Sequence, residues 1–158
     1  LHFLKLHRPD LPAGAHWLEL GASPGGMTAE LLDRGYRVTA IDRAELDPRL
    51  NRADGLTFVR RDVDAFQPGD TYDALLCDMN GDPRASLRQV VRLAGNLRPG
   101  GRILFTLKTA GADTPEEMLG LLRAAEAYAR ASGLHFIART HLSYNRQEFT
   151  LFYEVGSK

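Results

Sequence analysis

A glycine-rich turn between a strand-like and a helix-like segment constrains the fold most strongly. The apolar run at 16–20 is followed at once by Gly-Ala-Ser-Pro-Gly-Gly at 21–26, and Met27, Leu31 and Leu32 then recur at helical spacing. Glycines let the backbone approach a ligand closely, and the following helix offers free N–H groups and a positive dipole end. The segment therefore predicts a strand, a tight ligand-binding turn and a helix.

Strand-like runs recur along the rest of the chain, with amphipathic helix patterns between several of them. Strands are expected at 16–20, 36–41, 56–60, 74–77, 102–107, 134–141 and 148–155, and further helices at 85–97 and 115–132. Alternation of strands and helices predicts right-handed βαβ units and a parallel sheet. The six residues between the last two strands are too few for a crossover helix, so these strands should form a hairpin. We expect an α/β domain over residues 1–158, with a mostly parallel, Rossmann-like, seven-stranded sheet that ends in an antiparallel hairpin.

Composition narrows the class of protein. A length of 158 residues suits one domain, and no apolar run approaches the roughly 20 residues that a membrane span needs. The single cysteine, Cys77, suits a reducing cytoplasm. The five histidines show no metal-ligand spacing, so no metal site is expected. The chain begins with Leu1 rather than Met, which favours a longer protein from which an N-terminal part is missing.

The glycine spacing favours a carboxylate ligand over a pyrophosphate. Gly21, Gly25 and Gly26 form Gly-x-x-x-Gly-Gly, with Pro24 among them, whereas the dinucleotide fingerprint is G-x-G-x-x-G. An NAD site is therefore a poorer interpretation than a site for the methionine end of S-adenosylmethionine.

Two acidic residues extend this site. Asp42 ends the second expected strand, 21 residues after Gly21, where a carboxylate can accept both ribose hydroxyls of a nucleoside. Asp62 lies just past the third strand, within reach of an adenine amino group. Each carboxylate alone is typical of a solvated turn. Their joint placement at successive strand ends favours S-adenosylmethionine as the cofactor.

The segment ELGASPGGMT at 19–28 resembles the D-L-G-A-x-P-G-G-[WF]-[ST] signature of the FtsJ-like ribose 2′-O-methyltransferases. It departs from that signature at Glu19, which is one methylene longer than Asp, and at Met27, where the family usually has an aromatic residue. The resemblance implies a class I methyltransferase fold that binds S-adenosylmethionine. The expected cofactor-binding residues are Glu19, Gly21, Ser23, Pro24, Gly25, Gly26, Met27, Asp42, Asp62 and Asp78.

The same family uses a Lys-Asp-Lys-Glu catalytic tetrad, and the resemblance implies that Lys5, Asp78, Lys108 and Glu148 fill it. The chain has only three lysines, with Lys158 as the third, while its other 17 basic residues are arginines. Arg cannot give up its proton, whereas a buried Lys can. We expect desolvation and Lys5 to lower the pKa of Lys108, so that Lys108 accepts the proton of a ribose 2′-hydroxyl or orients that hydroxyl. Asp78 and Glu148 would hold the lysines in place.

Several further segments resemble the bacterial members of this family that methylate large-subunit ribosomal RNA. They are residues 77–79, Pro83 and 141–148. In that group the catalytic domain follows an RNA-binding module, which implies RNA, and specifically rRNA, as the partner and suits a net charge of zero on this chain. Tyr144 and Arg146 in the hairpin loop could stack on or steer RNA, or could belong to a plain surface loop.

Two other functions stay open at this point. The same cofactor fold also methylates small molecules and proteins, and the fold alone does not choose between substrates. A domain that has lost activity could also serve as an RNA-binding module. The complete tetrad favours RNA ribose methylation over both.

Overall fold

The computed structural model describes residues 11–141 and 147–156. Lys5, Tyr144 and Arg146 lie outside these described residues. The strands are β1 (His16–Leu20), β2 (Arg37–Asp42), β3 (Leu56–Arg60), β4 (Tyr72–Cys77), β5 (Leu97–Lys108), β6 (Leu134–His141) and β7 (Glu148–Val155). The helices are α2 (Gly26–Asp33), α3 (Pro83–Ala94) and α4 (Pro115–Ala131), with short 3₁₀ turns η1 (Pro48–Leu50) and η2 (Val63–Ala65).

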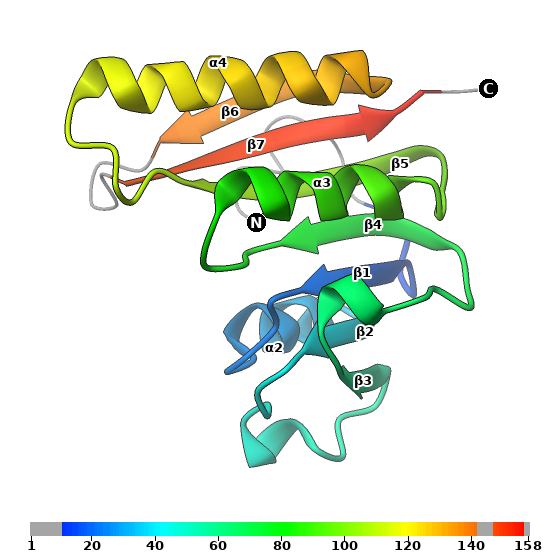
Figure 1. Ribbon diagram of the computed structural model, residues 1–158. Helices are drawn as coiled ribbons and strands as arrows, with labels where there is room; N and C mark the ends of the chain where they lie inside the picture. The colour runs from blue at the N-terminus through cyan, green and yellow to red at the C-terminus, as the bar shows by residue number, and fades with distance from the viewer. Residues whose placement is uncertain (1–10, 142–146, 157–158) are drawn as a thin grey trace.

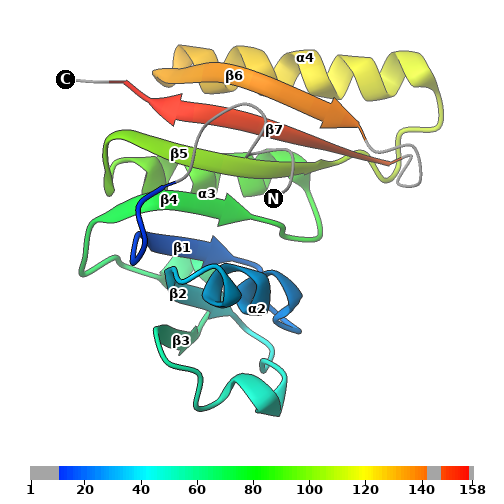
Figure 2. The ribbon, with the colours of Figure 1, turned by 180° about the vertical axis from the view of Figure 1, so that it is seen from behind.

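The strands form one sheet in the order β3-β2-β1-β4-β5-β7-β6. Strands β1 to β5 pair in parallel, while β7 is antiparallel to both β5 and β6. The helices α3 and α4 cover one face of the sheet (Figure 1), and α2 covers the other face (Figure 2). The expected mostly parallel, seven-stranded sheet with a terminal antiparallel hairpin is therefore confirmed.

The core consists of two apolar layers, one on each face of the sheet. All five residues of β1 are buried, because a central parallel strand is covered on both sides. Successive side chains of a strand point to opposite faces, so Trp17 packs in the layer that contains Leu31 of α2. Leu18 packs in the layer that contains Leu87 of α3 and Leu122 of α4. Packing in these two layers fixes the positions at which the parallel strands end.

The structure differs from the sequence expectation around Pro99-Gly100-Gly101. That segment was expected to separate a helix at 85–97 from a strand at 102–107, but α3 ends at Ala94 and β5 already begins at Leu97. Leu97 pairs with Tyr72 and Arg102 with Ala74, so the strand absorbs the extra residues as an irregularity. Gly100, with φ of 74°, supplies the left-handed conformation that this irregularity uses.

The connections on either side of β3 also differ from simple strand–helix alternation. In the structure, β2 leads to β3 through η1, and β3 leads to β4 through η2. Asp62 caps the start of the η2 turn, and its side chain accepts the N–H of Asp64. These short turns leave the ends of β2 and β3 open rather than covering them with a full helix.

Candidate cofactor and catalytic site

A cleft lies at the edge of the sheet where the parallel strands end. It has a volume of about 430 Å³. Strands β2 and β3 lie on one side of β1, and β4 lies on its other side, so the strand order changes direction between β1 and β4. Open α/β sheets bind ligands at such a topological switch point. Five of the predicted cofactor-binding residues line this cleft, namely Gly21, Ser23, Asp42, Asp62 and Asp78.

Gly21 is fixed by its backbone conformation and by its neighbours. It has φ of 76°, which is the left-handed region that favours glycine, and its N–H donates to the Ile41 carbonyl at 3.0 Å. A Cβ added to Gly21 would lie 2.9 Å from the Asp78 carbonyl oxygen and 2.9 Å from Cγ of Met79. The turn therefore lets the backbones that follow β1 and β4 meet closely at the cleft.

Asp42 is held rigidly at the end of β2. One carboxylate oxygen accepts the Ser23 N–H at 2.9 Å, and the other accepts the Ala44 N–H at 2.8 Å. A carboxylate offers about four lone-pair sites, so each oxygen keeps a site for another donor. Binding of the two ribose hydroxyls by Asp42 stays a prediction.

Asp62 lines the cleft from the end of β3, with its carboxylate 3.7 Å from the Arg43 guanidinium. Sequence reasoning missed several other lining residues, which are Arg43, Arg61, Val63, Asp64, Met79, Asn80, Asp82, Ala85, Ser86 and Gln89. Most of them lie in the segments that directly follow β2, β3 and β4. The rule that ligands bind beyond the carboxyl ends of parallel strands was the signal that could have identified those segments.

The start of α2 is open to a ligand. Its N-cap, Gly25, provides no side-chain cap, whereas Asp82 caps α3 and Thr114 forms a capping box with Glu117 on α4. The first N–H groups of a helix lack partners within the helix, and they favour an anion. A Cβ added at Gly26 would meet nothing within 4 Å, so this position offers free space next to those groups.

The other five predicted cofactor-binding residues lie outside the cleft lining; they are Glu19, Pro24, Gly25, Gly26 and Met27. Pro24 is exposed in the turn, and Gly25 packs so closely against Leu50 that an added Cβ would clash with Leu50 Cδ1. Met27 is partly buried against the α2 side of the core. These three residues shape the turn in the structure, and their contact with a cofactor stays a prediction.

Glu19 is buried beneath the turn, with only 1% of its surface exposed. Its carboxylate accepts the Thr28 hydroxyl at 2.7 Å, which links β1 to the first turn of α2. Burial raises the pKa of Glu19 to about 7, against the Thr28 hydrogen bond, which lowers it, and Asp78 and Asp42 add to the increase. Glu19 therefore titrates near neutral pH.

This raised pKa predicts a specific dependence of stability on pH. The folded protein binds the Glu19 proton more tightly than the unfolded chain does. Protonation of Glu19 therefore makes its full contribution to the free energy of unfolding below pH 4.5, and this contribution is lost as the pH rises through about 7. Glu19→Gln should remove this dependence and make the protein about 3 kcal/mol more stable than wild type at pH 8. Urea unfolding at pH 5 and pH 8 measures the effect. The exposed Glu116→Gln is the control, and an equal pH dependence in Glu19→Gln and wild type would contradict the prediction.

Lys108 bridges two carboxylates at the edge of the cleft. The antiparallel register pairs Lys108 at the end of β5 with Glu148 at the start of β7, and the Lys108 ammonium lies 2.5 Å from Glu148 Oε1. It also lies 2.8 Å from Oδ1 of Asp78, which follows β4. The structure thus brings together three of the four predicted tetrad residues, while Lys5 lies outside the described residues.

The expected lowering of the Lys108 pKa was wrong in direction. Desolvation does lower this pKa, but the hydrogen bonds and charges of Asp78 and Glu148 outweigh it and raise the pKa above 10.5. Both carboxylates favour the charged ammonium at short range. In these surroundings the Lys108 side chain is a charged ammonium and a hydrogen-bond donor.

The described residues contain neither a metal-binding cluster nor a membrane-spanning helix. Within 11–141 and 147–156, no group of three or more His, Cys, Asp or Glu side chains could hold a metal ion. No helix of the described part is long and apolar enough to cross a membrane.

Comparisons with known proteins identify relatives of the chain. Ribosomal RNA large subunit methyltransferase M of Methylococcus capsulatus is 33% identical over 156 residues, which are 95% of this chain and 43% of the relative. The protein of the same name from Halorhodospira halophila is 32% identical over 142 residues, 88% of this chain and 39% of the relative. The chain is a relative of these methyltransferases. It spans less than half the length of either, and no family model matches it.

Solved structures show the same fold. The fibrillarin pre-rRNA processing protein of Methanococcus jannaschii has a TM-score of 0.77 at 16% identity, over 94% of this chain and 70% of its own. The 1,6-didemethyltoxoflavin-N1-methyltransferase of Burkholderia thailandensis has a TM-score of 0.70 at 22% identity, over 99% of this chain and 76% of its own. The predicted Rossmann-like class I methyltransferase fold is confirmed.

Proposed function

We propose that the chain transfers a methyl group from S-adenosylmethionine to a ribose 2′-hydroxyl of RNA, and that this RNA is large-subunit ribosomal RNA. The observation that carries the proposal is the Lys108 ammonium between Asp78 and Glu148, beside the cleft. The names of the relatives support ribosomal RNA as the substrate.

The cleft suits S-adenosylmethionine in both of its halves. The open start of α2 suits the carboxylate of the methionine end, and Asp42 suits the ribose hydroxyls of the nucleoside. The Burkholderia thailandensis methyltransferase of the same fold was solved with S-adenosylhomocysteine bound, which supports this cofactor class. Bound S-adenosylmethionine supplies an electrophilic methyl group on a sulfonium.

The residues of the chain assist the attacking oxygen electrostatically. An ammonium has three N–H donors: Lys108 donates one to Glu148, and a second faces Asp78 Oδ1 in an ion pair at 2.8 Å. We assign the third donor to the ribose 2′-oxygen, where it stabilises the negative charge that develops during attack. Because Lys108 is already protonated, the hydroxyl proton passes to water at the open edge of the cleft, where 40% of the Asp78 side chain is exposed. Lys5 as the second lysine of the tetrad stays a prediction.

The wider setting of the domain is also a proposal. The chain spans 43% or less of the two relatives described above, and the family resemblance implies an RNA-binding module elsewhere in the protein.

Cys77 is fully buried, and burial raises its pKa to about 12, so it stays a protonated thiol. A reducing cytoplasm suits such a residue.

Transfer of label from methyl-labelled S-adenosylmethionine tests the proposal. We expect label in ribosomal RNA and none in protein or small molecules from the same extract. Asp42→Ala should weaken cofactor binding by about 10- to 100-fold, because it removes the acceptors for the ribose and the anchor of Ser23. The control is Asp54→Ala, since Asp54 lies outside the cleft lining. Label in protein or small molecules instead of RNA would contradict the proposed substrate, and wild-type cofactor affinity in Asp42→Ala would contradict the site.

A further inference from the structure

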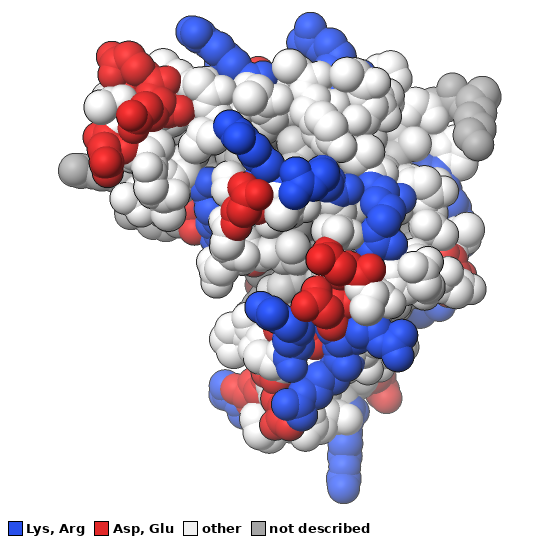
Figure 3. Space-filling model, in the orientation of Figure 1, with Lys and Arg blue, Asp and Glu red and all other residues white. Residues whose placement is uncertain are grey.

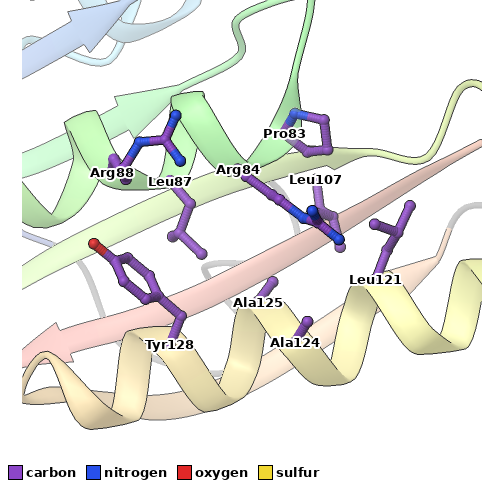
Figure 4. A pocket seen from close by; sticks show the side chains of 9 residues that line it. All are labelled: Pro83, Arg84, Leu87, Arg88, Leu107, Leu121, Ala124, Ala125 and Tyr128. Atoms are coloured by element: carbon purple, nitrogen blue, oxygen red, sulfur yellow. The ribbon is translucent and has the colours of Figure 1, made fainter.

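A second hollow lies between α3 and α4, apart from the cofactor cleft (Figure 4). It has a volume of about 240 Å³, and buried apolar side chains, among them Leu87, Leu107 and Ala125, form its floor. Arg84 and Arg88 line it from α3, and Tyr128, which is 43% exposed, reaches toward α3 from α4. The hollow, called the α3–α4 groove below, therefore combines an apolar floor with a cationic and aromatic rim.

The two arginines of the rim are available to a ligand. Arg84 and Arg88 are exposed, and within the described part of the chain neither guanidinium has an ion pair or side-chain hydrogen bond. Arg92, one turn further along α3, differs because its guanidinium donates to the carbonyls of Phe66 at 3.0 Å and Val63 at 2.8 Å. Basic side chains gather over α3 on this face of the molecule (Figure 3). Arg92 serves the fold, whereas Arg84 and Arg88 leave two positive charges without a structural role.

The α3–α4 groove continues toward the catalytic edge. A neighbouring hollow shares Pro83, Arg84 and Leu121 with it and extends to 110–112, in the loop that follows Lys108. Two carboxylates of this neighbouring hollow already bind backbone N–H groups. They are those of Asp82, which accepts from Arg84 and Ala85, and Glu117, which accepts from Asp113 and Thr114. The α3–α4 groove is therefore continuous with a hollow that reaches the loop after Lys108 and whose two carboxylates are oriented toward backbone N–H groups.

We propose that the α3–α4 groove binds an unpaired nucleotide of the RNA strand next to the nucleotide that is methylated. Arg84 and Arg88 bind its phosphates, and its base lies on the apolar floor against Tyr128. Arg guanidinium groups suit phosphate, and unpaired bases stack on aromatic side chains. A volume of 240 Å³ suits a single base but is too small for a helix, which is about 10 Å wide with its side chains. This inference rests on the proposed function, because it takes RNA as the substrate.

Binding of a fluorescein-labelled, single-stranded RNA of about 12 nucleotides and mixed sequence tests the groove. The double variant Arg84→Gln/Arg88→Gln should bind this RNA about 10-fold more weakly. The slope of log affinity against log salt should become shallower by about 1.4, since each lost phosphate contact on a single strand accounts for about 0.7. Arg123→Gln, an exposed arginine of α4 outside the groove, is the matched control and should change neither value. An unchanged affinity and salt slope in the double variant would overturn the proposal.

A second pair of variants tests the base-stacking part. Tyr128→Ala should weaken RNA binding by about 5- to 10-fold, whereas Tyr128→Phe, which keeps the ring, should bind as wild type does. In methylation assays the arginine and Tyr128→Ala variants should raise KM for RNA and leave kcat and cofactor affinity unchanged. A lowered kcat with an unchanged KM would overturn the groove as a binding site.

The same assays separate this inference from the proposed function. If wild type methylates RNA and the groove variants share its KM, the groove proposal fails and the function stands. If wild type transfers no methyl to RNA while the groove variants still bind RNA more weakly, the proposed function fails, and the groove stands as an RNA-binding site without its link to the methylated nucleotide.

Discussion

Replacement of Lys108 by Met is expected to lower kcat for RNA methylation by about 100- to 1000-fold, with cofactor affinity unchanged. Met keeps the length of the side chain and removes the donor that we assign to the 2′-oxygen. The Lys108 side chain is only 15% exposed and is clamped by Asp78 and Glu148, so solvent cannot replace its charge readily. Single-turnover rates and calorimetric cofactor binding measure the two effects.

A charge-conserving variant and the pH dependence of the rate test the same role of Lys108. Lys108→Arg keeps the charge, but its planar fork cannot reproduce a compact ammonium between two carboxylates, so we expect a loss of about 100-fold. Because the pKa of Lys108 is raised above 10.5, its contribution should be full at neutral pH and should be lost only as the pH rises beyond that value. A rate that instead rose with deprotonation of Lys108 near pH 7 would show that it acts as a base. Near-normal turnover in Lys108→Met would remove Lys108 from the mechanism.

Gly21→Ala is expected to destabilise the protein by about 3 to 4 kcal/mol. The left-handed backbone disfavours alanine by about 1 to 2 kcal/mol, and the added Cβ would press on the Asp78 carbonyl and on Met79 at 2.9 Å. Relief of that contact would push the segment after β4 away from the turn, so cofactor affinity should also fall by at least about 10-fold. Thermal unfolding and cofactor titration measure both changes.

Gly35 offers a matched control for Gly21. It has a similar φ of 78°, but a Cβ added there would meet nothing within 4 Å. Gly35→Ala should therefore show only the backbone effect of about 1 to 2 kcal/mol and no loss of cofactor affinity. Equal destabilisation in the two variants would mean that the close approach at Gly21 contributes nothing.

Much of the fold and of the site follows from patterns along the sequence. Asp42, Asp78 and Lys108 each occur at the end of an expected strand, and parallel strands bring their carboxyl ends to one edge. The short link before β7 predicted an antiparallel hairpin, and β7 does pair antiparallel with β6. Such features depend on local periodicity and chain connectivity, both of which a single sequence contains.

Other features depend on contacts that the sequence does not specify. The register that sets Lys108 opposite Glu148 comes from the pairing of β5 with β7, which are separated by α4 and β6 in the chain. The family resemblance placed Asp78 and Glu148 near the lysines, but only the structure shows how closely both carboxylates approach Lys108, so the expected sign of its pKa shift was wrong. The α3–α4 groove depends likewise on how two distant helices pack, so no local pattern indicated it.

The nucleoside that receives the methyl group tests the central claim most directly. After incubation of the protein with methyl-labelled S-adenosylmethionine and ribosomal RNA, the RNA is digested to nucleosides and analysed by mass spectrometry. We predict label on the ribose of a 2′-O-methyl nucleoside, and its absence with Lys108→Met. Label on a base, or a 2′-O-methyl nucleoside formed equally well by Lys108→Met, would contradict ribose methylation assisted by Lys108.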